Sequence, residues 1–311
     1  MYRRSLLTLL PSAALAFPER AITVVVPFAA GGSTDIAARL LGERLGGLLG
    51  QRVVVENRTG AGGAVGSEAV KRATPDGHTL LFASASSHGA NPAVFRDLPY
   101  DAVADFAPVA LTGVTPLALA VPPGGAADLP ALRRALADGR GAYGSAGAGS
   151  ITHLAAELFL QRTGLRAEHI PYRGGAPALE ALARAEVVFA FDTLAGLSAL
   201  GADGRIRLLA VATERAAAGL PTLESMGVAP FDLSTWNALL APAATPPERV
   251  ARLAVATHAA LAEPALNARL AQLGMAVPEP TGPDATRAFI ASEIAKFRAV
   301  ALAAGLRLER P

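Results

Sequence analysis

The sequence has no cysteine, few aromatic residues and almost no lysine. The lack of thiols excludes disulfide bonds, thiolate catalysis and cysteine-ligated metal sites. Aromatic residues make up 5% of the chain and charged residues 17%, against 51% hydrophobic residues. This balance is typical of a compact globular protein and not of a disordered one. The 311 residues suffice for one large domain or two of medium size.

Hydrophobic runs suited to a membrane helix are also missing. The longest uncharged run, 106–127, contains four prolines, which interrupt helices: Pro108, Pro116, Pro122 and Pro123. Residues 5–16 are uncharged and mostly apolar but are too few to span a bilayer comfortably. We therefore predict a soluble mature protein.

The first 16 residues resemble an export signal. Arg3 and Arg4 precede the apolar segment, which ends in the A-x-A-like Ala14-Leu-Ala16. An ordinary N-terminal helix is the alternative, and the export route, Sec or twin-arginine, stays open. We predict cleavage after Ala16 and a periplasmic location. Cleavage would bring the formal charge of +2 to zero, which leaves no electrostatic basis for a nucleic acid or an anionic membrane as partner.

Strand-like and helix-like segments alternate through most of the chain. A first set predicts strands at 22–28, 52–56 and 79–83, with helices at 35–49 and 64–72 between them. A second set predicts strands at 141–145, 167–172, 186–191 and 205–212, with helices at 129–137, 151–162 and 175–184. The remainder, 246–305, reads as helix broken near Pro264 and again at 278–283. This order predicts an α/β protein with two doubly wound, mainly parallel sheets in two lobes.

A glycine loop at 27–35 joins the first predicted strand to the first helix. Its sequence, Pro27-Phe-Ala-Ala-Gly-Gly-Ser-Thr-Asp35, places Ser33 or Thr34 as the helix cap and Asp35 in the first turn. The N–H groups and the dipole at such a helix start attract anions. The loop lacks the lysine of a phosphate loop, so we predict a small carboxylate held mainly by backbone. The candidate ligand-binding residues here are Phe28, Ala29, Gly31, Gly32, Ser33, Thr34 and Asp35.

A second glycine loop, 144–150, precedes the helix predicted at 151–162 and would face the first loop across a cleft. Asp192 ends a predicted strand, where it either binds a ligand amine or hydroxyl or caps the next helix. Arg173 either pairs with a carboxylate or is solvated. The further candidates are Ser84, Ser86, Ser145, Ala146, Gly147, Gly149, Ser150, His153, Tyr172 and Asp192.

Other kinds of site fit the sequence less well. The glycines of 60–66 are spaced G-x-G-x-x-x-G and follow the second strand, which disfavours a dinucleotide site. No two histidines are four residues apart, which disfavours a metal, and no cofactor is expected. Ser145, His153 and Asp192 have the residue types of a hydrolytic triad without the G-x-S-x-G motif. An exported serine hydrolase therefore remains the alternative from another class.

Several motifs in order along the chain resemble the Bug family of extracytoplasmic solute receptors, the binding subunits of tripartite tricarboxylate transporters. The motifs are Val26-Pro-Phe-Ala-Ala-Gly-Gly-Ser-Thr-Asp35, Val55-Glu-Asn-Arg-Thr-Gly-Ala-Gly-Gly63, Pro75-Asp-Gly-His-Thr-Leu80, Asp105-Phe-Ala-Pro-Val109, Gly144-Ser-Ala-Gly-Ala-Gly-Ser150 with His153-Leu154, Pro171-Tyr-Arg-Gly-Gly175, Arg207-Leu-Leu-Ala-Val211, Leu220-Pro-Thr222 and Ala241-Pro-Ala-Ala-Thr-Pro246.

The resemblance implies a type II periplasmic-binding-protein fold, with two α/β lobes, two crossing segments and a ligand cleft between the lobes. It implies lobe 1 at 17–119 and 235–311 and lobe 2 at 120–234. We predict that binding closes the two lobes by a hinge near 118–121 and 233–236. The resemblance also implies that both glycine loops grip a ligand carboxylate and that Asp192 selects the ligand type.

The prediction for function is therefore a monomeric, non-catalytic receptor. It would capture a di- or tricarboxylate, an acidic amino acid or a related organic acid and deliver it to membrane subunits of a tripartite transporter. A receptor that signals instead of feeding a transporter is a second alternative.

Overall fold

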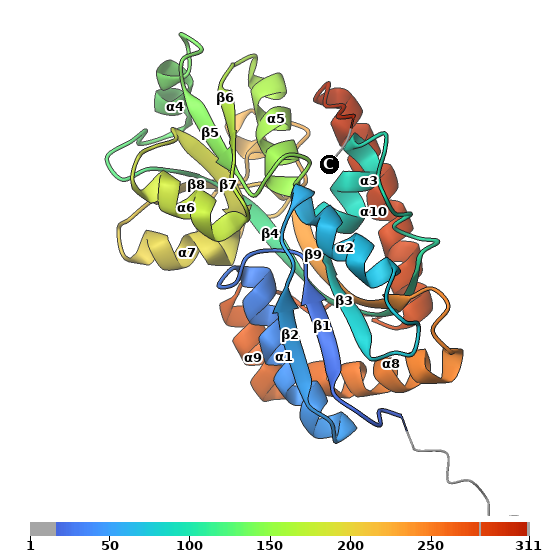
Figure 1. The fold of residues 1–311 in the computed structure, drawn as a ribbon. Coiled ribbons are helices and arrows are strands. Elements are labelled where there is room, and N and C mark those ends of the chain that lie inside the picture. The colour runs from blue at the N-terminus through green and yellow to red at the C-terminus, as the bar shows by residue number, and fades with distance from the viewer. Residues whose placement is uncertain (1–16, 280, 310–311) are drawn as a thin grey trace, which may run out of the picture.

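A computed structural model describes residues 17–279 and 281–309 of the chain. The predicted export signal, 1–16, lies outside the described residues. Two α/β lobes are visible in Figure 1, the green and yellow lobe above and the blue and orange one below. The predicted fold class is confirmed by this arrangement.

Lobe 1 is built on a sheet in the order β2-β1-β3-β9-β4. The first three strands are parallel, and β9 runs antiparallel to both β3 and β4. Its strands are β1 (Ile22–Val26), β2 (Val53–Asn57), β3 (Thr79–Ser84), part of β4 (Phe106–Val121) and β9 (Ser234–Pro242). Its helices are α1 (Ser33–Leu49), η1 (Ala61–Gly63), α2 (Ala64–Lys71), η2 (Ser86–Ala90), α3 (Asn91–Val94), α8 (Pro247–Leu261), α9 (Pro264–Gln272) and α10 (Pro283–Ala303).

Lobe 2 is built on three parallel strands, β7-β5-β6, joined at β7 to the end of β4. Strand β8 pairs antiparallel with the other edge of β4. Its strands are β5 (Ala142–Ser145), β6 (Glu168–Pro171), β7 (Phe189–Thr193) and β8 (Arg207–Val211). Its helices are α4 (Leu129–Ala135), α5 (Ile151–Thr163), α6 (Gly175–Ala183), α7 (Leu194–Ala202) and η3 (Glu224–Met226).

Successive side chains of a strand point to opposite faces of its sheet, and helices cover both faces of each sheet here. In β1, Val24 and Val26 pack with α1, α8 and α9, whereas Val25 packs on the side of α2, α3 and α10. In β4, Leu117 and Leu119 face the α5 side and Ala118 faces the α7 side. A strand that is buried on both faces needs apolar residues at nearly every position, which explains the continuous apolar runs in the sequence.

The long strand β4 and its partner β9 are absent from the strands predicted from the sequence, because the prolines of β4 were read only as an argument against a membrane helix. The residues of β4 as far as Pro116 pair with β9, and from Leu117 onward they pair with β7 and β8. Proline lacks the N–H of a sheet hydrogen bond. Accordingly, Pro108 lies beside a register shift and Pro116 forms the last pair with β9. This single strand therefore belongs to both lobes and joins them, as Figure 1 shows.

Candidate functional site

Four helices begin around a cavity of about 320 Å³ between the lobes. Helix α1 comes from lobe 1, and α5, α6 and α7 come from lobe 2; residues of the first turn of each line the cavity. Each follows a strand, so the helix starts meet where parallel strands end, the usual ligand position in open α/β sheets. The cavity lies at the small end of the range of ligand pockets.

Ten of the candidate residues line this cavity. They are Phe28, Ala29, Gly31, Gly32, Ser33, Thr34, Ser84, Ser86, Ala146 and Asp192. The others do not line it: Asp35, Ser145, Gly147, Gly149, Ser150, His153 and Tyr172. Arg173 is exposed and also lies outside the lining.

The start of α1 differs from its expected form. Gly32, and not Ser33 or Thr34, is the N-cap residue, in extended conformation with φ −76° and ψ 164°, and no side chain caps the helix. Gly31 adopts a φ of +86°, which favours glycine at this turn. The first-turn N–H groups of α1 are therefore left available on the cavity side.

Asp35 stabilises this loop from behind. Its carboxylate accepts hydrogen bonds from the Gly31 N–H at 3.0 Å, from Arg39 at 2.9 and 3.0 Å, and from Asn57 at 2.9 Å. Burial alone would raise the pKa of Asp35, but the hydrogen bonds from Arg39, Gly31 and Asn57 outweigh it and lower the pKa. The Asp35 carboxylate thus fixes the loop geometry and is ionised at neutral pH.

The polar groups of the second glycine loop are mostly used within lobe 2. Ser150 is the N-cap of α5, as expected, and its Oγ accepts from the His153 N–H at 3.2 Å. Ile151 N–H donates across the cleft to Ser86 Oγ at 3.1 Å, and Ala146 N–H donates to Thr152 Oγ1 at 2.9 Å. Two of the first three N–H groups of α5, those of Ile151 and His153, therefore already have acceptors within the protein.

The structure does not assemble the triad of Ser145, His153 and Asp192. Ser145 is buried and its Oγ lies 2.7 Å from Nε2 of His169, a different histidine. His153 Nδ1 accepts from the Gly149 N–H at 3.1 Å, and its ring stacks on His169 at 3.9 Å. Burial lowers the pKa of His153 to about 3 and that of His169 to about 4, so both are neutral at pH 7.

Asp192 lies between the starts of α6 and α7. Its Oδ1 accepts from the Thr193 N–H at 2.6 Å, and a Cβ built on Gly175, the first residue of α6, would lie 2.6 Å from Oδ2. Thr193 is the N-cap of α7, with its Oγ1 accepting from Gly196 N–H at 3.2 Å. The Asp192 carboxylate thus occupies the positive ends of both helices. It is only 8% exposed, and burial raises its pKa to about 6 against the opposing hydrogen bonds from Thr193.

We expect Asp192→Asn to stabilise the ligand-free protein at neutral pH, since the amide keeps the acceptor for Thr193 and removes a buried charge. The pKa of Asp192 is about 6 in the folded protein, above the value of 3.8 for the unfolded chain. In the unmodified protein, protonated Asp192 therefore contributes to the free energy of unfolding, and this contribution is fully present below about pH 4 and is lost as the pH rises through 6. A shift of about two pKa units corresponds to at most roughly 3 kcal/mol.

Urea unfolding between pH 4 and pH 8 measures this effect. The gain in the free energy of unfolding of Asp192→Asn should grow from pH 4 to pH 7 and then level off. Asp203→Asn, which removes an exposed charge at the end of α7, should show no such rise. A gain for Asp192→Asn that does not vary with pH would contradict the assignment.

The sequence reading overlooked most of the apolar wall. Leu117, Ile151, Leu179, Leu200 and Leu273 line the cavity together with the starts of α6 and α7. The signal available for the two helix starts was a glycine or a threonine directly after a strand, at Gly175 and Thr193. Leu179 and Leu200 carried no comparable signal, because a leucine on an amphipathic helix has the same pattern whether it faces a core or a cavity.

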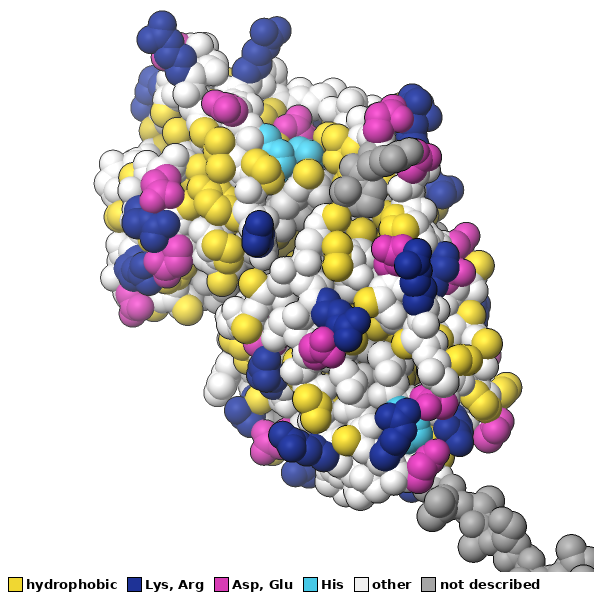
Figure 2. All heavy atoms as spheres, in the orientation of Figure 1, with side chains coloured by type: hydrophobic (Ala, Val, Ile, Leu, Met, Phe, Trp, Pro, Cys, Tyr) yellow, Lys and Arg dark blue, Asp and Glu magenta, His cyan; other side chains and the backbone are white. Residues whose placement is uncertain are grey.

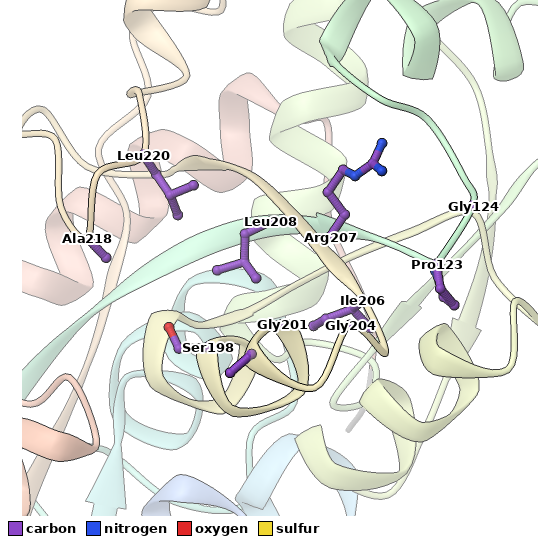
Figure 3. A pocket seen from close by; sticks show the side chains of 11 residues that line it. Pro123, Gly124, Ser198, Gly201, Gly204, Ile206, Arg207, Leu208, Ala218 and Leu220 are labelled. Atoms are coloured by element: carbon purple, nitrogen blue, oxygen red, sulfur yellow. The ribbon is translucent and has the colours of Figure 1, made fainter.

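A further cavity of about 520 Å³ lies on lobe 2 between α7 and β8 (Figure 3). It is lined by the C-terminal half of α7, including Ser198 and Gly201, and by Leu208, Leu220 and Arg207. The C-terminal end of a helix carries partial negative charge, which disfavours an anion. In the described part of the chain, no group of three or more acidic, histidine or cysteine side chains could hold a metal ion. None of the helices in residues 17–279 and 281–309 combines the length and the hydrophobicity of a membrane-spanning segment.

Two α/β lobes that share strand β4 and enclose a ligand-sized cavity define a periplasmic-binding-protein fold. A family model described as "Tripartite tricarboxylate transporter family receptor" matches residues 37–306. Protein BugT of Bordetella pertussis (strain Tohama I) is 35% identical over 308 residues, 96% of this chain and 94% of the relative. The chain therefore belongs to the tripartite tricarboxylate transporter receptor family, which confirms the resemblance to the Bug proteins.

Solved structures agree with this assignment. MatC from Rhodopseudomonas palustris, with bound malate, aligns with a TM-score of 0.88 and 32% identity over 91% of this chain and 99% of its own. A second R. palustris protein, solved with adipate, aligns with a TM-score of 0.88 and 33% identity over 94% and 99% of the two chains. The similarity extends over both lobes.

Proposed function

We propose that this protein is a periplasmic receptor that captures a small carboxylate between its lobes. The observation that carries the proposal is the uncapped start of α1, whose first-turn N–H groups border the inter-lobe cavity. A carboxylate suits such a helix start because the unpaired N–H groups and the helix dipole both favour negative charge. The malate and adipate bound by the two R. palustris relatives support this ligand class.

Binding would be coupled to closure of the lobes. We place the hinge where β4 changes partners after Pro116 and where the chain returns to β9 near Ser234. Lobe 1 would then comprise 17–119 and 235–311, and lobe 2 would comprise 120–234. Contacts across the cleft support a closed state here, since Ile151 N–H donates to Ser86 Oγ at 3.1 Å and a Cβ on Gly62 would lie 2.9 Å from Ala148 O.

We further propose that the closed receptor, as a monomer, delivers its ligand to the membrane subunits of a tripartite transporter. A role as the ligand sensor of a signalling protein is the alternative within the same fold. Catalysis is disfavoured because the three triad candidates bind other groups.

Titration of the protein secreted to the periplasm with mono-, di- and tricarboxylates, followed by thermal shift, tests the proposal. A ligand at 100 times its Kd should stabilise the folded state by about 2.7 kcal/mol. Sodium chloride and methyl esters of the same acids serve as controls for ionic strength and for the apolar body. The absence of any shift across the panel would count against a carboxylate receptor. Ester hydrolysis that disappears in Ser145→Ala would favour the hydrolase instead.

A further inference from the structure

The glycine-rich segment between β2 and α2, which does not suit a dinucleotide, forms a tight left-handed turn. Residues 60–63 all have a positive φ, from +50° at Ala61 to +139° at Gly60. The Gly63 N–H closes the turn by donating to Gly60 O at 2.9 Å. A positive φ is unfavourable for alanine, and strained backbone of this kind persists where the surrounding structure requires it.

This turn meets lobe 2 at the loop before α5. A Cβ built on Gly62 would lie 2.9 Å from Ala148 O, and one built on Gly147 would lie 3.8 Å from Gly62 N. The two segments, 60–63 and 147–149, consist only of glycine and alanine, so their backbones approach without a long side chain between them. In Figure 2 a notch separates the lobes on the left of the view, and the lobes meet toward its middle, where uncharged atoms predominate.

The same turn supports the wall of the inter-lobe cavity. A Cβ on Gly63 would lie 3.1 Å from Cζ of Phe28, which lines the cavity. The contact between the lobes and the ligand cavity are therefore joined through adjacent residues of one turn.

Asn91 is buried between the turn and lobe 2. Its Nδ2 donates to Gly62 O at 3.2 Å. Its Oδ1 lies 2.9 Å from the Cβ position of Gly62 and 3.3 Å from that of Gly149 in lobe 2, and has no hydrogen-bond partner among the described residues. A buried acceptor without a donor is unfavourable, and separation of the lobes would expose it to water. This contact therefore limits closure and does not itself hold the lobes together.

On the basis of the proposed closure over a ligand, we propose that Gly62 and Ala148 form the stop that sets the closed position of the lobes. Gly62 is then a positioning residue for ligand binding. Glycine lets the lobes approach until the hydroxyl oxygens of Ser33 and Thr193 lie 3.5 Å apart across the cleft. A side chain at position 62 would meet Ala148 O, a backbone atom, before this position is reached. The groups of the two lobes would then be too far apart to contact one ligand together.

The rate of disulfide formation between Ser33→Cys and Thr193→Cys, measured with oxidised glutathione and without ligand, tests how readily the lobes reach the closed position. Adding Gly62→Ala should slow this rate by at least about tenfold, the effect of an overpacked contact. Titration calorimetry with malate and adipate should show affinity reduced by a similar factor in Gly62→Ala without the cysteines. Because a Cβ on Gly62 also meets Asn91 Oδ1 in its own lobe, the same comparison is made with Asn91→Ala present in both proteins.

The matched control is Gly77→Ala. Gly77 also has a positive φ, of +81°, and its Cβ would lie 2.9 Å from Cζ of Phe17, within lobe 1. Both substitutions should lower the melting temperature of the ligand-free protein, because both place alanine at a positive φ. Only Gly62→Ala should slow disulfide formation.

Three results would overturn the proposal: equal rates with and without Gly62→Ala, equal slowing by Gly77→Ala, or no disulfide in any of the proteins. The second would make lost stability the cause, and the third would mean that the lobes do not close onto this contact. The rate is measured without ligand, so failure of the proposed function is a separate result. Slowing by Gly62→Ala alone, with no binding of any carboxylate, would support the stop in a receptor for another class of ligand.

Discussion

Replacement of Ser33 by proline should weaken carboxylate binding by about 10-fold to 100-fold, the loss expected for one hydrogen bond to a charged group. Ser33 is the first residue of α1 and lines the cavity. Proline is favoured at the first position of a helix, where its missing N–H costs nothing within the helix. The preceding Gly32, with φ −76° and ψ 164°, already has the conformation that a following proline requires.

The matched control is Ser33→Ala, which removes the hydroxyl and keeps the N–H. Ser33 Oγ is 3.5 Å from Thr193 Oγ1 on the opposite lobe, so alanine tests the contribution of that contact. Titration calorimetry with the panel carboxylate that gives the largest thermal shift provides the measurement. We expect a Kd near that of the unmodified protein for alanine and a much higher Kd for proline, with unchanged melting temperatures without ligand. Equal affinities for the two variants would remove the backbone of α1 from the ligand site.

The sequence predicted the fold well where the residue pattern of a segment agrees with its burial in the folded protein. Runs such as 22–26 and 79–83 are buried on both faces, and the glycines after 22–26 mark where α1 begins. The same reasoning located loop 27–35, because a glycine turn between a strand and a helix has a defined geometry. Six of its seven candidate residues line the cavity.

The second loop shows where local reasoning failed. Ser145, Gly147, Gly149 and Ser150 have the same residue types as the first loop, yet their polar groups contact neighbours within lobe 2. Some of these partners lie within four residues, as His153 does for Gly149, but the contacts of Ser145 with His169 and of Ile151 with Ser86 join residues distant in sequence. No pattern within ten residues encodes those contacts.

At Asp192, the residue that would favour stability differs from the residue that is present. A carboxylate at this position loses hydration, as its raised pKa reflects, and an amide would satisfy Thr193 without a charge. A position where charge lowers stability is a candidate for a functional constraint. Asp192 lines the cavity, so the carboxylate that lowers stability at neutral pH is also placed to contact a ligand.

A disulfide between Ser33→Cys and Thr193→Cys should trap bound carboxylate and slow its release by more than about tenfold, since the ligand leaves only when the lobes separate. The hydroxyl oxygens of these residues are 3.5 Å apart across the cleft, and Ser33→Cys keeps the backbone N–H. The chain has no native cysteine, so only this pair can form. Oxidation with radiolabelled ligand present, followed by dialysis, measures the release rate.

Reduction of the same double variant should restore fast release, and each single cysteine variant should release ligand at the rate of the unmodified protein. The disulfide requires the two lobes to be as close as the structure has them, because its Cα atoms must lie within about 7 Å. Failure of the thiols to pair in the presence of ligand, or equally rapid release from the oxidised and reduced forms, would mean that ligand exchange does not depend on separation of the lobes. Slow release from the oxidised form alone would establish that Ser33 and Thr193 belong to opposing surfaces that close over the ligand.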